Sequence, residues 1–170
     1  VDFGFVLYDW GDLPNEATAT NSPIYRTTLD EGGASHIVIP GLSIGSKEDG
    51  EVDGQPTASA NGDDNSLSDD EDGVILPAFI AGQDAVVTVS VINTTGADAY
   101  LYGFIDLNGD GDFDDSGESV SALVPGDGSV STLPLTYSVP IDADISQLLG
   151  ARFRLSSDDD LTANGAAPDG

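Results

Sequence analysis

The chain contains no cysteine, no methionine, one histidine and only four lysine and arginine residues among its 170 residues. Without cysteine, the protein has no disulfide, no thiolate nucleophile and no cysteine-ligated zinc. Its 31 Asp and Glu residues give a formal net charge of −27 at pH 7. Because binding to nucleic acids or anionic headgroups requires clusters of Lys and Arg, this composition excludes DNA and RNA as partners.

Long hydrophobic runs are also absent. No apolar run approaches the roughly 20 residues of a membrane-spanning helix, and no secretion signal opens the sequence. We therefore expect no membrane insertion. The hydrophobic content of 39% exceeds that of disordered acidic tails, and the length suits a single domain over residues 1–170. Since the sequence begins at Val1 rather than at Met, we expect a module excised from a longer chain. We also expect this module to be monomeric.

The composition gives little support for catalysis. His36 is the only histidine and lies in a strand-like segment with Ile37 and Ile39, so we expect it to be structural. A hydrolase triad has no nucleophile elbow to build on. Pairs of carboxylates, as glycosidases use, occur everywhere in so acidic a chain and therefore carry no information. We expect that the protein is not an enzyme.

The most informative motif is the loop at residues 106–114, with the sequence DLNGDGDFD. Ca2+ takes roughly 6 to 8 oxygen ligands, and alternating Asp and Asn side chains in a curled loop supply them. Gly109 and Gly111 allow the positive φ angles of such a curl. We predict a calcium site with the ligands Asp106, Asn108, Asp110, Asp112 and Glu118, and with Asp114 bound directly or through water. A solvated acidic hairpin tip is the alternative.

This loop differs from an EF-hand. Its first six positions match that pattern, but the twelfth position is Gly117 and the acid, Glu118, comes one residue later. The flanking segments resemble strands, whereas an EF-hand has flanking helices. We therefore expect a closed, structural ion that joins two strands.

Alternation of apolar residues and runs of β-branched residues predict eight strands. Their expected positions are residues 2–8, 35–39, 74–80, 85–92, 100–106, 119–124, 130–139 and 151–155. One helix is expected at residues 142–149, between the N-cap Asp142 and the stop signal Gly150. The sequence thus predicts an all-β fold, an antiparallel two-sheet β-sandwich with long calcium-binding loops and at most one short helix.

Residues 45–73 form a second acidic region with few apolar side chains. A loop of this length inside a compact domain is usually either functional or disordered. Two like charges 4 Å apart repel by about 4 kcal/mol at an effective dielectric of 20, so the clustered carboxylates favour divalent cations. A flexible, solvated insert is the alternative.

Several runs of residues resemble the GEVED domain of bacterial surface proteins. They are DWGDLP at 9–14, GEVDGQP at 50–56, GDDN at 62–65, DDEDGV at 69–74, GFIDLNGDG at 103–111 and ARFRLS at 151–156. The runs keep the family's order over nearly the whole chain, and they are most similar to the peptide-binding domains of giant RTX adhesins. In that group the resemblance implies a calcium-rich β-sandwich that captures the C-terminal end of a peptide, with one exposed Ca2+ gripping the carboxylate.

The resemblance also implies where these ions lie. Further metal ligands are expected at Asp12, Glu51, Asp53, Asp63, Asp64, Asp70 and Asp72, and the exposed, ligand-gripping calcium is expected at Asp53, Asp64 and Asp72. The expected partner is the C-terminus of a peptide or protein on a target cell, met outside the cell at the bacterial surface, in adhesion or biofilm formation. Two alternatives remain open, a calcium-dependent carbohydrate-binding module and a structural extender that calcium makes rigid.

Three further groups of residues have two interpretations each. Asp158, Asp159 and Asp160 either bind another ion together with Asp169 or form a solvated charge run. Arg152 and Arg154 share one face of a strand, where we expect them to brace nearby acids rather than to pair with a peptide carboxylate. The aromatic residues Trp10, Tyr25, Tyr100 and Tyr102 either line a binding groove or, as is usual in sandwiches, belong to the core.

Overall fold

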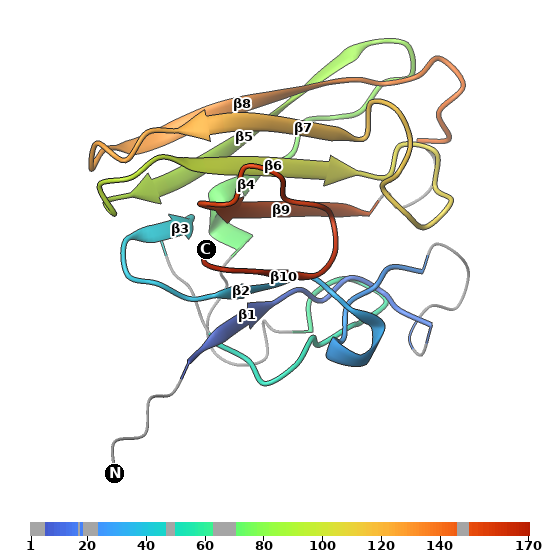
Figure 1. Cartoon of the computed structure of the whole chain (residues 1–170). Coiled ribbons are helices and arrows are strands. Elements are labelled where there is room, and N and C mark those ends of the chain that lie inside the picture. Colours follow the sequence, from blue (N-terminus) through green and yellow to red (C-terminus); the bar gives the residue numbers. More distant parts are fainter. Residues whose placement is uncertain (1–5, 17, 19–23, 47–49, 63–70, 146–149) are drawn as a thin grey trace.

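The computed structural model describes residues 6–16, 18, 24–46, 50–62, 71–145 and 150–170. Within these residues the chain forms ten strands, which are arranged in three sheets (Figure 1). Two sheets face each other as a sandwich, and the third lies beside it. The all-β, sandwich-like fold that the sequence predicts is therefore confirmed.

The first sheet of the sandwich is built around the long strand β5 (Asp84–Asn93). On one side β5 pairs from Asp84 to Ile92 with β8 (Val130–Ser138), and on the other it pairs with the short strands β3 (Leu42–Ile44) and β4 (Val74–Ile75). All of these pairs are antiparallel. β5 thus holds together segments that lie far apart in the sequence.

The second sheet has β6 (Ala99–Ile105) at its centre, between β7 (Ser119–Val124) and β9 (Ala151–Ser156). Both pairs are antiparallel. The acidic loop that follows Ile105 leads from β6 into β7, so it closes a hairpin at one end of this sheet.

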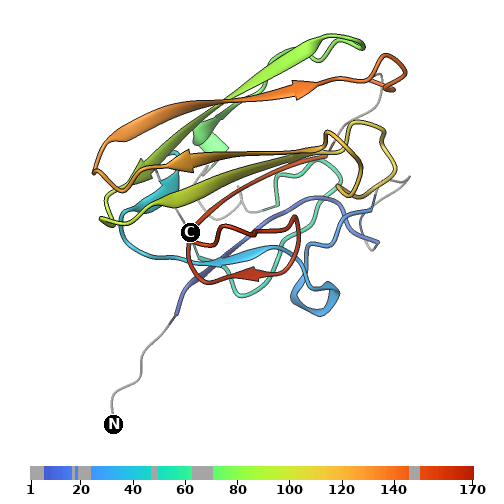
Figure 2. The ribbon, with the colours of Figure 1, turned by 45° about the horizontal axis from the view of Figure 1, so that its top comes forward.

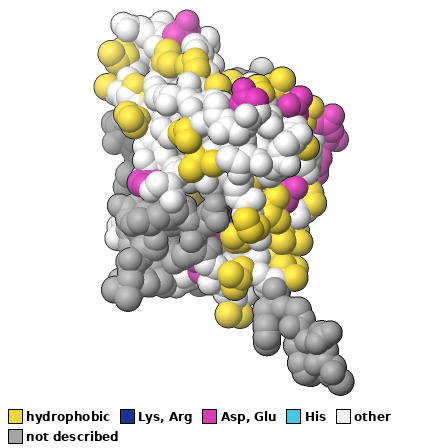
Figure 3. All heavy atoms as spheres, turned by 90° about the vertical axis from the view of Figure 1, so that its left-hand side faces the viewer, with side chains coloured by type: hydrophobic (Ala, Val, Ile, Leu, Met, Phe, Trp, Pro, Cys, Tyr) yellow, Lys and Arg dark blue, Asp and Glu magenta, His cyan; other side chains and the backbone are white. Residues whose placement is uncertain are grey.

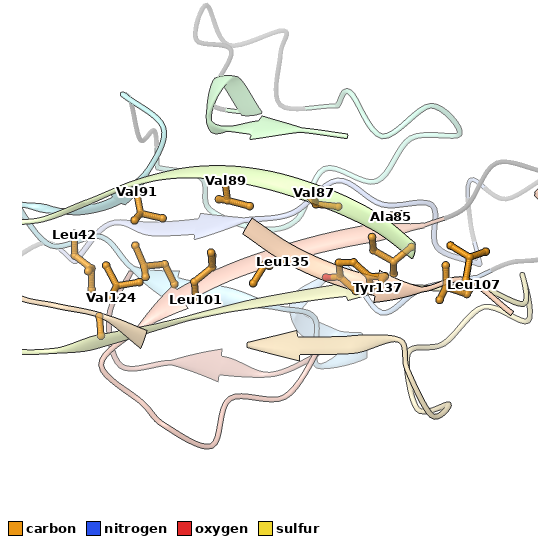
Figure 4. Close-up of a cluster of buried hydrophobic side chains, with 14 residues drawn as sticks. Leu42, Ala85, Val87, Val89, Val91, Leu101, Leu107, Val124, Leu135 and Tyr137 are labelled. Carbon is orange, nitrogen blue, oxygen red and sulfur yellow. The ribbon is translucent and has the colours of Figure 1, made fainter. Parts of the chain in front are cut away.

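The main core lies between these two sheets (Figure 4). Val87, Val89 and Val91 alternate along β5 with more exposed residues, because successive side chains of a strand point to opposite faces. They pack in one cluster with Leu101 of β6 and Leu135 of β8. Burial of each such side chain contributes about 1.5 to 3 kcal/mol, and this core is the main source of stability.

The third sheet consists of β1 (Tyr8–Trp10), β2 (Ser35–Ile37) and β10 (Ala166–Ala167). β1 and β2 are antiparallel, whereas β10 runs parallel to β2. Figures 1 and 2 show this sheet beside β9, on the side away from β8. A third sheet with a parallel pair is an addition to the two antiparallel sheets that the sequence predicts.

Helical structure is limited to two short 3-10 helices among the described residues, η1 (Leu29–Glu31) and η3 (Glu71–Gly73). The helix expected at residues 142–149 is not found over 142–145, and residues 146–149 lie outside the described part of the chain. In the part of the chain that the structure describes, no helix has the length and apolar character to cross a bilayer.

Several predicted strands agree closely with the structure, and the one at residues 119–124 has the same bounds. The prediction at 2–8 is wrong for residues 6 and 7, because the strand there begins at Tyr8, and residues 2–5 lie outside the described residues. The strand predicted at 74–80 ends at Ile75, where its pairing with β5 ends. β3 and β10 were not predicted.

Core packing leads to a first prediction. Leu101 is 0% exposed in the main cluster, whereas Leu123 on the neighbouring strand is 50% exposed. We expect Leu101→Ala to lower the free energy of unfolding by about 2 to 5 kcal/mol, because it leaves a cavity in a packed core. Leu123→Ala should cost less than about 1 kcal/mol. Urea denaturation of both variants measures the difference, and equal losses would contradict this description of the core.

Candidate functional site

The acidic loop after β6 is curled by hydrogen bonds from its own backbone to its own side chains. One carboxylate or amide oxygen of each of four residues accepts a bond from a backbone N–H two or three residues ahead. These bonds join Gly109 to Asp106 at 2.6 Å, Asp110 to Asn108 at 3.0 Å, Asp112 to Asp110 at 3.3 Å and Asp114 to Asp112 at 2.9 Å. Gly109 and Gly111 have φ angles of 75° and 99°, as expected from the spacing of the motif.

Two carboxylates of this loop region are buried. Asp106 is 0% exposed and Glu118 is 2% exposed. The oxygens of Asp106 accept bonds from the N–H groups of Gly109 and Gly111 and from the hydroxyl of Tyr25, at 2.6 to 2.9 Å. Burial raises the pKa of the Glu118 carboxyl, and the charge of Asp106 raises it further.

The partners of Glu118 are also neutral. Its carboxylate accepts bonds from the backbone N–H groups of Leu107, at 2.8 Å, and Asp115, at 3.3 Å. Two buried negative charges with neutral partners are expensive to keep ionised, because the dielectric inside a protein is low. A divalent cation would offset this cost.

At the mouth of the loop, three polar side chains meet. The amide nitrogen of Asn108 donates to one carboxylate oxygen of Asp110 at 3.0 Å and to one of Asp115 at 2.7 Å. Asp115 was not among the predicted ligands, although it lies in the same acidic run. Asp112 and Asp114 are exposed, and the bonds described for them are those of the turns.

This loop fits calcium in the chemical type of its side chains. Its side chains offer only oxygen ligands, which Ca2+ prefers, together with two buried carboxylates that have neutral partners. However, within the described residues no three Asp, Glu or His side chains gather into a group that could hold a metal ion. The calcium site therefore stays a prediction.

The loop is fastened to the N-terminal half of the chain through Tyr25. The hydroxyl of Tyr25 donates to Asp106 at 2.8 Å and accepts a bond from the backbone N–H of Gly150 at 3.0 Å. Its ring stacks on Phe113, with centroids 5.1 Å apart. A side chain at position 150 would collide with this ring, because an added Cβ would lie 2.2 Å from the Tyr25 hydroxyl. Tyr25 thus belongs to a second aromatic core.

The acids predicted from the second acidic region have separate local contacts. Asp53 accepts bonds from the N–H groups of Leu29 at 2.7 Å and Gly54 at 2.8 Å, so it holds the first residue of η1, whose N-cap is Thr28. Glu51 accepts a bond from the N–H of Trp10 at 3.1 Å.

Two more predicted ligands, one of them from the N-terminal run, hold the ends of loops. Asp72 accepts bonds from the N–H and the hydroxyl of Ser46, at 3.0 and 2.6 Å, and thereby closes the base of the acidic segment. Asp12 is buried and accepts a bond from the N–H of Gly62 at 3.0 Å. The predicted ligands Asp63, Asp64 and Asp70 lie outside the described residues, so the proposed group of Asp53, Asp64 and Asp72 stays a prediction.

The two arginines of β9 donate their hydrogen bonds to neutral groups, mostly backbone carbonyls. Nearby acids act on them through charge, because Asp12 raises the pKa of Arg152, and Asp158 and Asp9 raise the pKa of Arg154, against the effect of burial. The expected bracing of acids is therefore one of charge and not of hydrogen bonds. Arg152 is buried and donates to the carbonyls of Ala163 and Arg26 and to the side chain of Asn164, each at 2.8 Å. Its guanidinium lies 5.7 Å from the ring centroid of Phe113. Burial lowers the pKa of this group to about 10.

Arg154 uses all five of its N–H groups. It donates to His36 at 2.9 Å, to the carbonyls of Thr162 and Asn164 at 2.6 and 3.1 Å, and to those of Gly165 and Ser35 at 2.7 and 3.2 Å. These bonds attach both the C-terminal segment and β2 to β9. A fixed guanidinium fork suits this arrangement of carbonyls.

His36 is buried between Arg154 and the C-terminal segment, as its predicted structural role requires. Its Nε2 accepts the bond from Arg154, so its Nδ1 carries the proton and donates to the carbonyl of Asp169 at 2.9 Å. Burial lowers its pKa to about 4, with help from the positive charge of Arg154.

The C-terminal acids form a local hydrogen-bonded turn. Both carboxylate oxygens of Asp169 accept bonds from Ser156 and Ser157. Asp158 accepts a bond from the N–H of Asp160 at 3.1 Å. Neither of the two predicted interpretations is favoured by these contacts.

Basic residues are nearly absent from the surface. Arg152 and Arg154 are buried, Arg26 is exposed, and the fourth basic residue, Lys47, lies outside the described part of the chain. Figure 3 shows Asp and Glu side chains and hydrophobic patches on one described face. An anionic ligand would approach such a surface against repulsion unless a bound cation offset the charge.

Comparison with known protein families supports the resemblance seen in the sequence. The family model of the GEVED domain matches residues 100–170, which include β6 to β10, the acidic loop and both buried arginines. The chain is thus similar to the GEVED family over residues 100–170. Searches among curated proteins and among solved structures gave no match.

The contact between Tyr25 and Asp106 leads to a prediction on stability. Tyr25→Phe removes the hydroxyl that serves both Asp106 and Gly150. We expect the free energy of unfolding to fall by about 2 kcal/mol, since a bond to a buried charged group is lost. Tyr102→Phe is the matched control, because its hydroxyl bonds an exposed carbonyl, that of Asp159. Urea denaturation at fixed calcium compares the two variants, and similar losses would refute a special role for Tyr25.

The buried histidine predicts a pH dependence. Because the folded-state pKa of His36 falls from 6.5 to about 4, the unfolded chain binds more protons between these values. Stability from this residue is therefore present above pH 6.5 and is lost as the pH falls toward 4, by about 3 kcal/mol in all. His36→Gln keeps an acceptor for Arg154 and does not titrate. The stability difference between wild type and variant, measured from pH 7 to pH 4, cancels the titration of the shared carboxylates, and a constant difference would contradict the prediction.

Proposed function

We propose that this chain is a calcium-dependent ligand-binding module of a bacterial surface protein, and that it captures the C-terminal carboxylate of a peptide or protein on a target cell. The observation that carries the calcium dependence is the pair of buried carboxylates, Asp106 and Glu118, whose partners are all neutral. The GEVED match over residues 100–170 supports the setting of a bacterial surface protein.

Two regions of the chain would have different roles, one structural and one in ligand binding. Asp106, Glu118 and the side chains around Asn108 hold the hairpin between β6 and β7 in its curled form. Bound calcium would supply a positive charge that neutralises these carboxylates and, at an exposed site, attracts an anion. The acidic segment, closed at its base by Asp72 and Ser46, is where we place the exposed ion.

A structural extender is the second candidate function. The burial of Asp106 and Glu118 favours it, because an ion at these groups would be enclosed by protein oxygens and would have no position left for a ligand. In this case calcium would stiffen the module without any binding partner. A carbohydrate-binding module has no observation in its favour among the described contacts.

A peptide array with free and amidated C-termini tests the proposal. We expect binding only to free C-termini and only in calcium, with loss of binding in EDTA. We also expect chelation to lower the melting temperature, since a ligand that binds only the folded state stabilises it. Asp106→Asn should reduce the calcium-dependent rise, whereas Asp98→Asn, at an exposed position in the turn before β6, should leave it unchanged.

The outcomes separate the candidates. Equal binding of amidated peptides would contradict capture of the carboxylate. A large rise in melting temperature with calcium but no ligand on the array would favour the structural extender. A melting temperature that EDTA leaves unchanged would contradict both.

A further inference from the structure

A cavity of about 190 Å3 lies where the third sheet meets the sandwich. Its lining includes Trp10 and Gly11 from β1 and the residue after it, His36 from β2, Ser43 from β3, and Arg152 from β9. At about 30 Å3 per water, this volume suits about six waters or one small organic molecule.

Unpartnered hydrogen-bond donors distinguish this cavity. Trp10 is 7% exposed, and its indole N–H is buried with no acceptor among the described residues. Arg152 donates through both N–H groups of Nη1 and one of Nη2, so its Nε–H and second Nη2–H have no acceptor in the described structure. A buried donor without an acceptor, such as this indole N–H, costs about 1 to 3 kcal/mol.

The neighbouring Arg154 gives an internal comparison. All five of its N–H groups have acceptors, so it has no donor left for a ligand. Arg152 therefore differs from Arg154 in having free donors beside the cavity. The oxygens that it does bind are all neutral, so its charge has no hydrogen-bonded carboxylate partner.

The charges around the cavity limit the ligand. Arg152 and Arg154 of β9 contribute two positive charges to the lining. Asp9 of β1 and Asp12, two residues after β1, contribute two negative charges, and His36 is neutral. A guanidinium binds a carboxylate through two parallel N–H bonds, which are stronger than bonds to neutral acceptors. The two aspartates disfavour a dianion such as phosphate, because like charges repel in a space of this size.

We propose that this cavity is a binding site for a small monocarboxylate, held by the indole N–H of Trp10 and the free N–H groups of Arg152. The carboxylate comes either from a free short-chain acid or from the last residue of a peptide. Arg152 supplies the positive charge here, so the site does not rest on the calcium-dependent capture proposed above.

Trp10 provides a direct readout, because it is the only tryptophan of the chain. The full chain, at fixed calcium and ionic strength, is titrated with sodium acetate while tryptophan emission is recorded. We expect a saturable change with acetate and at least about tenfold weaker binding of acetamide, which has the same shape without the charge. N-acetylglycine, which mimics a peptide end, separates the two sources: if it binds as acetate does, the site accepts chain ends, and if only acetate binds, it accepts free acids.

Gly11→Leu tests the place of binding. An added Cβ at Gly11 would meet no other atom within 4 Å, so a side chain can begin there without a clash, and a leucine would extend into the space that Gly11 lines. We expect an unchanged melting temperature and at least a tenfold loss of acetate affinity. Arg152→Lys, which keeps the charge and loses the planar fork, should also weaken binding at least tenfold, while Arg26→Lys at the exposed position should not.

Results that contradict the carboxylate site differ from results that contradict calcium-dependent peptide capture. No saturable response to acetate, equal binding of acetamide, or full acetate binding by a folded Gly11→Leu variant would each overturn the carboxylate site. Capture of free C-termini on the peptide array, measured with the same Gly11→Leu protein, reports on the calcium-dependent function alone. Loss of acetate binding with retained peptide capture would show two separate sites.

Discussion

The two guanidinium groups of β9 hold the third sheet and the C-terminal segment to the sandwich. Arg154 places all five of its N–H groups on β2 and on residues 162–165, and Arg152 binds carbonyls at Arg26 and Ala163. In a chain with a net charge of −27, two of the few basic side chains are thus used inside the protein. Most of their carbonyl partners come from segments with little regular structure, whose polar groups need such donors when buried. The cavity, the buried histidine and the parallel strand β10 all border these two residues.

The sandwich could be predicted from sequence because its strands carry their own signal. Val87, Val89 and Val91 alternate with less buried residues, and the strand that contains them was predicted to within one residue at each end. β3 and β10 gave no such signal, since three and two residues are too few for a periodic pattern. They form because distant segments offer partners: β5 for β3, and β2 for β10. The carbonyl partners of Arg152 and Arg154 could not be predicted for a related reason, because a backbone carbonyl has no signature in the sequence.

The acidic loop shows how much of a site can be predicted from the spacing of a motif. Its curl, its glycines and the burial of Asp106 and Glu118 agree with an oxygen-rich loop that closes a hairpin. The roles of Tyr25 and Asp115 were not foreseen, because Tyr25 is 81 residues away from Asp106 and Asp115 falls outside the alternation of the motif. The sequence predicts Asp12, Asp53 and Asp72 as metal ligands, yet the carboxylate of each also accepts a hydrogen bond from a backbone N–H. An acid that caps a loop and an acid that binds a metal look alike in sequence, because both need only a carboxylate.

The contact between Ser46 and Asp72 has a consequence for how this domain can vary. The two residues meet through two hydrogen bonds, and Gly45 and Gly73 beside them approach so closely that a Cβ at Gly73 would lie 2.4 Å from the nitrogen of Gly45. The two ends of the acidic segment therefore lie together, and between them Glu51, Asp53 and Gly62 attach its middle part to β1, to η1 and to Asp12. The entropy of closing a loop grows only with the logarithm of its length, by about 0.6 kcal/mol for each doubling. Insertions and deletions between these points of attachment can thus change the length and charge of the domain's surface while β3, β4 and the core behind them keep their positions.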